Sequence, residues 1–147
     1  MNSNSKPIIL GFYGESDSGK TTLVERLIHK LTEEGYHVAA VKKTNQSISI
    51  DSAGKDTQRY TQAGADLVVL STQIETAFLD KAKMSEKEMI TTIQHLGLFD
   101  FIFMEGANEK YIPKIRLGNI AERENTLFTY DDNFENLLDL IKNQNLK

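Results

Sequence analysis

The stretch IILGFY-GESDSGKTT, residues 8–22, decides the fold of this chain. Its second part, Gly14–Thr22, fits the phosphate-binding loop pattern, in which a glycine and any four residues precede Gly-Lys-Ser/Thr. The apolar run before it predicts a strand, and the residues after it predict a helix. This strand–loop–helix context favours a nucleoside triphosphate site over an ordinary Gly/Ser turn that happens to match the pattern.

Each part of such a loop has a physical role. Successive backbone N–H groups and the positive end of the helix dipole bind the phosphates, and glycines allow close approach. Lys20 is expected to reach the β- and γ-phosphates, and the Thr21 hydroxyl to bind Mg²⁺. The residues that we expect to form this phosphate site are Gly14, Glu15, Ser16, Asp17, Ser18, Gly19, Lys20, Thr21 and Thr22.

Composition limits the classes of function. The chain has 147 residues, of which 39% are hydrophobic, no cysteine, and a net charge of −4. This charge gives no general case for binding nucleic acid or an anionic membrane, and the lack of cysteine excludes disulfides and thiolate ligands. The polar start, residues 1–6, lacks the apolar core of a signal peptide, and no apolar run approaches the about 20 residues of a membrane span. We expect a cytoplasmic protein.

Hydrophobic periodicity predicts strands that alternate with helices. Strands are expected over 8–13, 36–41, 67–70, 76–79, 99–104, 112–117 and 126–130, and helices after the loop, over 57–63, after a capping box at 85–88, and after Asp132 as N-cap. We therefore expect one α/β domain over 1–147 with a P-loop NTPase fold, a mostly parallel sheet and helices on both faces. Residues 1–6 and 142–147 are expected to fray.

Hydrolysis needs a carboxylate near the γ-phosphate, and Glu105 is the candidate. It ends the most hydrophobic strand and precedes Gly106, so it can arrange Mg²⁺ or a water together with Lys20. The alternative is a solvated loop glutamate. Asp100, at the other end of that strand, is expected to be structural.

The polar stretch after the second strand holds further charges. It contains Lys42, Lys43, Asp51, Lys55 and Asp56. Asp51, Lys55 and Asp56 flank Gly54, so these three charged groups can converge on the nucleotide or on a second anionic ligand. Their spacing alone favours ordinary hydrated side chains.

A series of motifs resembles the molybdopterin-guanine dinucleotide biosynthesis adapter family, MobB. The series comprises the loop above with Leu23, then Val41-Lys42, Asp51-Ser-Ala-Gly54-Lys55-Asp56-Thr57, Ala63-Gly64-Ala65, Glu105-Gly106 and Pro113-Lys114-Ile115. The matches run in order from about residue 8 to residue 117. The middle of the series is far more specific than the loop, and it favours a binding role for Lys42, Asp51, Lys55 and Asp56.

The resemblance implies a GTP- and Mg²⁺-binding adapter with a slow GTPase and a homodimeric state. Its partner would be the guanylyltransferase that attaches GMP to molybdopterin, and molybdopterin is a further expected ligand. Guanine preference rests on the resemblance alone, because the chain has no Asn-Lys-x-Asp segment.

Two departures lie in the loops expected to face a ligand or partner. Histidines usual after Val-Lys are replaced here by Lys43-Thr-Asn-Gln46, and Ala107 and Asn108 stand where the family usually has an aromatic residue and a lysine. Two other functions stay open. One is a small-molecule kinase or ligase, and the other is a scaffold that binds nucleotide without hydrolysing it.

Overall fold

The computed structural model describes residues 5–51 and 55–143, except for the side chain of Lys55. The chain divides into two compact units. The first comprises Met1–Thr44 with Glu86–Lys147, and the second comprises Asn45–Ser85. The expected fraying at 1–4 and 144–147 falls outside the described residues, and the single domain over 1–147 stays a prediction.

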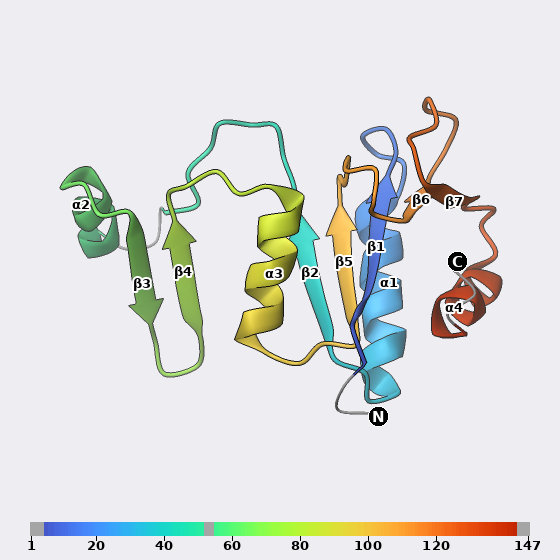
Figure 1. Cartoon of the computed structure of the whole chain (residues 1–147), viewed down its shortest axis with the longest axis horizontal. Coiled ribbons are helices and arrows are strands. Elements are labelled where there is room, and N and C mark those ends of the chain that lie inside the picture. The colour runs from blue at the N-terminus through green and yellow to red at the C-terminus, as the bar shows by residue number, and fades with distance from the viewer. Residues whose placement is uncertain (1–4, 52–54, 144–147) are drawn as a thin grey trace. The chain divides into compact units, whose positions relative to one another are not determined.

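The first unit is built on a parallel sheet of five strands in the order β2-β5-β1-β6-β7 (Figure 1). Its elements in chain order are β1 (Ile8–Tyr13), α1 (Lys20–Glu33), β2 (Val38–Lys42), α3 (Glu86–Leu96), β5 (Phe101–Glu105), β6 (Lys114–Arg116), β7 (Thr126–Thr129) and α4 (Phe134–Lys142). The expected α/β architecture with a mostly parallel sheet is confirmed.

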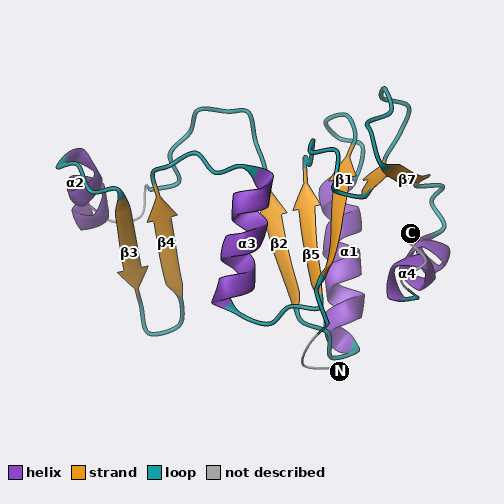
Figure 2. Ribbon diagram, viewed as in Figure 1, coloured by secondary structure: helices purple, strands orange, loops and turns teal. Residues whose placement is uncertain are grey.

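Helices cover both faces of this sheet (Figure 2). Successive apolar side chains of β1 and β5 point to opposite faces, so each face needs its own helical cover and forms its own core. One core joins Leu10 and Phe103 of the sheet to Leu27 of α1 and Leu137 of α4. The other core joins neighbouring strand residues to α3, and its buried members are Ile90, Ile102, Met104, Ala107 and Ile112. The sheet thus lies between two layers of helices, and the phosphate loop follows its central strand, β1.

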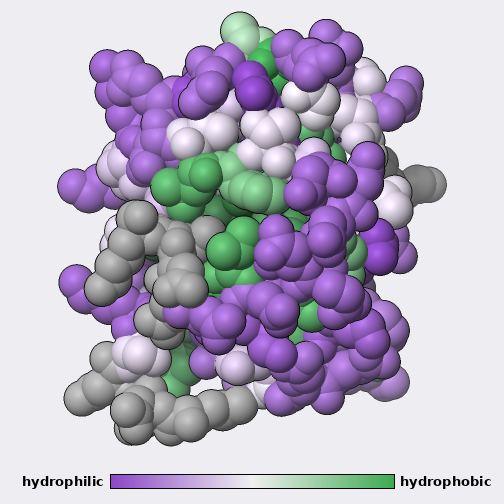
Figure 3. All heavy atoms as spheres, turned by 90° about the vertical axis from the view of Figure 1, so that its right-hand side faces the viewer, coloured by the Kyte–Doolittle hydropathy of each residue, from purple (hydrophilic) through white to green (hydrophobic). Residues whose placement is uncertain are grey.

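The helix α4 is amphipathic. Its buried residues are Phe134, Leu137, Leu138 and Ile141, which recur at helical spacing and face the core. Viewed from the side of β7 and α4, the surface is mostly hydrophilic, and hydrophobic side chains show mainly in its middle (Figure 3). Within the described residues, no helix is long and apolar enough to cross a membrane.

The N-cap predicted for α4 is wrong by one residue. Asn133 is the cap, and its side chain accepts a hydrogen bond of 3.1 Å from the Asn136 N–H. Asp132 has a φ of 65°, whereas an N-cap residue needs an extended backbone.

Strand ends also differ from the predicted ones, and two of these differences bear on the site. Strand β2 extends to Lys42, and β5 extends to Glu105, so both charged residues belong to the sheet edge itself. The predicted ranges 36–41 and 99–104 stop one residue earlier, because a charged residue looks like a loop residue in a hydrophobicity pattern.

The second unit contains α2 (Lys55–Gln62), β3 (Leu67–Ser71) and β4 (Thr76–Asp80). The two strands pair antiparallel and form a two-stranded sheet. Val69 lies directly opposite Phe78 in this hairpin, and their side chains are 47% and 56% exposed. The hairpin therefore presents apolar side chains at its surface.

Candidate functional site

The parallel register brings the carboxyl ends of three strands together at one end of the sheet. Glu105 of β5 pairs with Phe12 of β1 on one side and with Lys42 of β2 on the other. Strand β1 ends at Tyr13, and the phosphate loop begins with the next residue, at this same end of the sheet. Topology alone therefore places Lys42 and Glu105 beside the loop, which is where ligands bind in open parallel sheets.

The loop has the backbone that its glycines and Asp17 allow. Asp17 and Gly19 both have left-handed conformations, with φ of 62° and 89°. A Cβ added at Gly14 would lie 2.7 Å from the Leu117 carbonyl oxygen and 2.7 Å from Ser18 Oγ, so no side chain fits there. The close approach of the loop to the chain after β6 explains why position 14 needs glycine.

The first turn of α1 is open to an anion. Its N-cap is Gly19, which offers no side chain to accept the first N–H groups of the helix. The Lys20 amine folds back over the loop and donates to the carbonyls of Gly14 (2.9 Å) and Glu15 (2.6 Å). Ser18 Oγ is buried and has no hydrogen-bond partner among the described residues.

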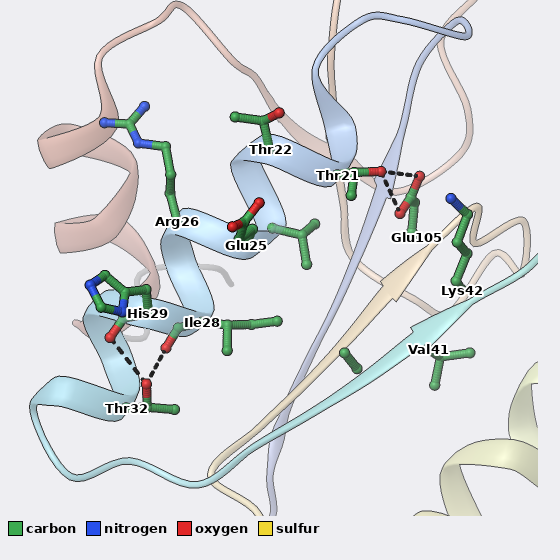
Figure 4. A pocket seen from close by; sticks show the side chains of 12 residues that line it. Thr21, Thr22, Glu25, Arg26, Ile28, His29, Thr32, Val41, Lys42 and Glu105 are labelled. Carbon is green, nitrogen blue, oxygen red and sulfur yellow. Dashed lines mark hydrogen bonds between the residues drawn. The ribbon is translucent and has the colours of Figure 1, made fainter.

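Thr21 and Glu105 meet across the sheet edge (Figure 4). The Thr21 hydroxyl donates to both carboxylate oxygens of Glu105, at 3.3 and 3.4 Å. Lys42 extends from the end of β2 toward the same place. A hydroxyl and a carboxylate are oxygen ligands of the kind that Mg²⁺ prefers, and Mg²⁺ is usually bound by one or two protein groups together with phosphates and waters. These residues therefore fit a magnesium ion that arrives with a nucleotide.

A pocket of about 580 Å³ opens at this edge, and its volume suits a polyphosphate. It is lined by Ser16, Asp17, Gly19, Lys20, Thr21, Thr22, Lys42, Lys43, Thr44 and Glu105. Most of the residues predicted for the phosphate site are thus brought together here, while Gly14, Glu15 and Ser18 shape the loop behind it. Lys43 and Thr44 line the pocket as well, and both belong to the stretch 43–46 that was expected to face a ligand or partner.

A larger groove of about 810 Å³ continues from the pocket between α1 and β2. Its walls include Glu25, Ile28 and Thr32 of the helix and Val41 of the strand (Figure 4). It shares Thr21, Thr22, Lys42 and Glu105 with the phosphate pocket.

Three predicted site residues belong to the second unit. Asp51 is buried, and its Oδ1 accepts a 2.8 Å hydrogen bond from the Thr57 hydroxyl, while Oδ2 has no partner among the described residues. Asp56 is exposed at the start of α2, and the Lys55 side chain lies outside the described part. Their part in binding a nucleotide stays a prediction.

Asp100 lies at the opposite edge of the sheet, as expected for a structural residue. Its carboxylate accepts a 2.7 Å hydrogen bond from the His37 N–H, and its carbonyl accepts another from Ile8. In the part of the chain that the structure describes, no three His, Cys, Asp or Glu side chains gather as a metal cluster.

The sequence reasoning missed Glu86, which begins α3 and is only 3% exposed. It accepts hydrogen bonds from the Lys43 amine (2.9 Å) and from the N–H groups of Asn108 (2.8 Å) and Glu109 (3.3 Å). Burial by itself raises the pKa of Glu86, but the Lys43 hydrogen bond and the two backbone donors outweigh it and lower the pKa below 4.5. Its sequence position, inside a capping box, gave no sign of these contacts.

Together the parallel sheet, its helices and the loop at the end of β1 define an α/β protein with a P-loop NTPase-like fold. The structure of Bacillus subtilis MobB is similar, with a TM-score of 0.72 and 20% identity over 95% of this chain and 98% of that one. That likeness establishes the fold.

Sequence comparison identifies the family. The profile of the family described as Molybdopterin guanine dinucleotide synthesis protein B matches residues 9–143, so the chain belongs to this family. Molybdopterin-guanine dinucleotide biosynthesis adapter proteins of Haemophilus influenzae and Escherichia coli are 32% and 29% identical to it over 78% and 74% of this chain. The chain spans 65% and 64% of the lengths of these two relatives.

The lowered pKa of Glu86 makes a pH-dependent contribution to stability. Because the folded-state pKa lies below 4.5, the contribution is complete above pH 4.5 and is lost as the pH falls through the folded-state pKa. We expect Glu86→Gln to lower the free energy of unfolding by about 2 kcal/mol at pH 7, and the difference from the natural protein to shrink at acid pH.

Urea unfolding at about pH 3 and at about pH 7, on either side of the ordinary glutamate pKa, measures this difference. Glu124→Gln is the control, because it removes an exposed ion pair with Lys110 and should cost less than about 1 kcal/mol. A Glu86→Gln deficit that stays constant with pH would contradict the assignment.

Proposed function

We propose that this chain is a GTP-binding adapter that assists molybdopterin guanine dinucleotide synthesis. In this proposal GTP and Mg²⁺ bind at the phosphate pocket, with Lys20 and the loop amides on the phosphates and Thr21 and Glu105 at the metal. The observation that carries it is the meeting of the Thr21 hydroxyl with the Glu105 carboxylate, in the same pocket that Lys20 lines at the open end of α1.

The adapter role is supported by family membership and by the names of the relatives, which are molybdopterin-guanine dinucleotide biosynthesis adapter proteins. The preference for GTP is part of the proposal and follows from the resemblance of the motifs. The partner that we propose is the guanylyltransferase that joins GMP to molybdopterin, with molybdopterin as a further ligand and the cytoplasm as the setting. The groove between α1 and β2 adjoins the phosphate pocket and offers space for such a second ligand.

The proposed hydrolysis is slow. Mg²⁺, when bound, neutralises charge on the transferring phosphoryl group. Lys20 and the loop amides stabilise the same charge, and Glu105 orients a metal-bound or attacking water. No arginine of the described residues lines the phosphate pocket.

Replacing Lys20 by alanine tests the binding site. We expect GTP affinity to fall about 10- to 100-fold, since a charge-assisted hydrogen bond to phosphate is lost. Stability should change little, because the Lys20 amine bonds only to the carbonyls of its own loop. Calorimetric titration of GTP and ATP in Mg²⁺ measures the affinity and the base preference, and an affinity unaffected by the change would refute the site.

Replacing Glu105 by glutamine tests the metal role. We expect the rate of phosphate release to fall about tenfold or more, while GTP affinity in the absence of Mg²⁺ stays the same. Multiple-turnover phosphate release, followed at several Mg²⁺ concentrations, provides the measurement. A rate and metal response equal to those of the natural protein would make Glu105 structural, and transfer of phosphate to a small-molecule acceptor would instead indicate a kinase.

We further propose a homodimer formed through the β3–β4 hairpin. Each strand of the hairpin has an unpaired edge within the described residues, and Leu67, Val69 and Phe78 expose about half of their side chains. A two-stranded sheet with apolar side chains at its surface gains most by pairing with an identical copy, because the contact is then self-complementary.

Aspartate substitutions at the opposed pair Val69 and Phe78 should convert this dimer into a monomer, since four carboxylates would meet at its interface. Sedimentation equilibrium measures the mass. The control is Leu98→Asp, at a position 80% exposed in the first unit, which should leave the dimer intact. A double variant that sediments as the natural protein does would exclude the hairpin as the interface.

A further inference from the structure

Glu86 is a buried carboxylate of the first unit that the proposed chemistry does not use. It begins α3, where the positive end of the helix dipole favours a negative charge. Its two oxygens share three donors, because Oε2 accepts from the Lys43 amine and Oε1 accepts from the N–H groups of Asn108 and Glu109. At 3% exposure this charge is stabilised by named partners, with little help from water.

The partners of Glu86 come from the two segments that flank the metal position. Lys43 follows β2 directly and lines the phosphate pocket, and its side chain is 30% exposed. Asn108 and Glu109 follow β5 and lie three and four residues beyond Glu105. One carboxylate therefore ties the ends of both neighbouring strands to the start of α3.

Glu105 is held between these same contacts. Its carbonyl accepts a 3.0 Å hydrogen bond from the Lys43 N–H, and the next residue, Gly106, donates 2.8 Å to the carbonyl of Phe12. Gly106 has a φ of 88°, and a Cβ added there would lie 3.3 Å from the Lys43 carbonyl oxygen. The backbone of Glu105 and Gly106 thus packs against Lys43, whose side chain Glu86 fixes.

We infer that Glu86 is a positioning residue, which orients Glu105 toward Thr21 by holding Lys43 and the 106–109 segment. It touches neither nucleotide nor metal in this assignment, and it acts on the metal only through Glu105. The inference rests on the proposed magnesium–GTP site. It also gives a role to Lys43, which stands where the related sequences described above usually have histidine, and to the main chain of Asn108.

Geometry of this kind predicts an effect on metal binding that an ordinary structural ion pair would not have. Loss of the residue that orients a metal ligand typically weakens metal affinity 10- to 100-fold. Glu86→Gln keeps an oxygen for the backbone donors but loses the ion pair, and Lys43→Met removes the amine while keeping an apolar stem of similar length.

The test is a Mg²⁺ titration of GTP binding by calorimetry, with a metal-free titration in EDTA beside it. The proteins are the natural chain, Glu86→Gln, Lys43→Met, the double variant, and Glu34→Gln. Glu34→Gln is the matched control, because it removes an ion pair with Lys142 at 2.6 Å from the far end of α1.

We expect each single change to raise the Mg²⁺ concentration at half-saturation about tenfold, and we expect Glu86→Gln to leave metal-free GTP affinity within about twofold. The double variant should be no worse than the worse single one, because the two residues act as a unit. The control should titrate as the natural protein does.

Two results would overturn the inference. One is a fall in melting temperature without any change in the Mg²⁺ titration, and the other is a double variant whose effects are simply additive. A natural protein whose GTP binding ignores Mg²⁺ would refute the proposed function itself. Should Glu86→Gln fail to fold, the Mg²⁺ titration of Lys43→Met decides the question. This variant keeps the hydrogen bonds from the Asn108 and Glu109 N–H groups to Glu86.

Discussion

The register of three parallel strands is the constraint on which the candidate site depends. Glu105 pairs with Phe12 of β1 on one side and with Lys42 of β2 on the other. Because parallel strands end at the same edge, a shift of one residue in β5 would turn the Glu105 carboxylate to the other face and away from Thr21. The two cores that clamp β5 therefore fix the chemistry as well as the fold.

The sequence predicted what local pattern encodes. The loop, the alternation of strands and helices and the carboxylate at the end of β5 are all visible in short windows, because glycine spacing and apolar periodicity are local properties. The exact ends of β2 and β5 and the cap of α4 were missed by one or two residues, since charged residues at strand ends resemble loop residues and Asp132 and Asn133 are both good caps.

Long-range contacts account for what the sequence could not predict. Glu86 has its partners 43, 22 and 23 residues away, so no pattern around it reveals the contacts. The same holds for Gly14, whose need for glycine depends on the carbonyl of Leu117. Ala107, which was noted from the sequence as a departure in a loop expected to face a ligand or partner, is instead fully buried. A Cβ added at Gly11 would lie 2.7 Å from the Cβ of Ala107. The departure thus belongs to the core.

In the proposed site, main-chain amides at the start of α1 bind a polyphosphate. The most direct measurement is the amide ¹H–¹⁵N NMR spectrum during titration with magnesium and GTP. We expect the amides of Gly19, Lys20 and Thr21 to shift first and furthest, because anion binding polarises the N–H groups that donate to the anion. Saturating nucleotide that shifts amides elsewhere and leaves these three unmoved would contradict the proposed site.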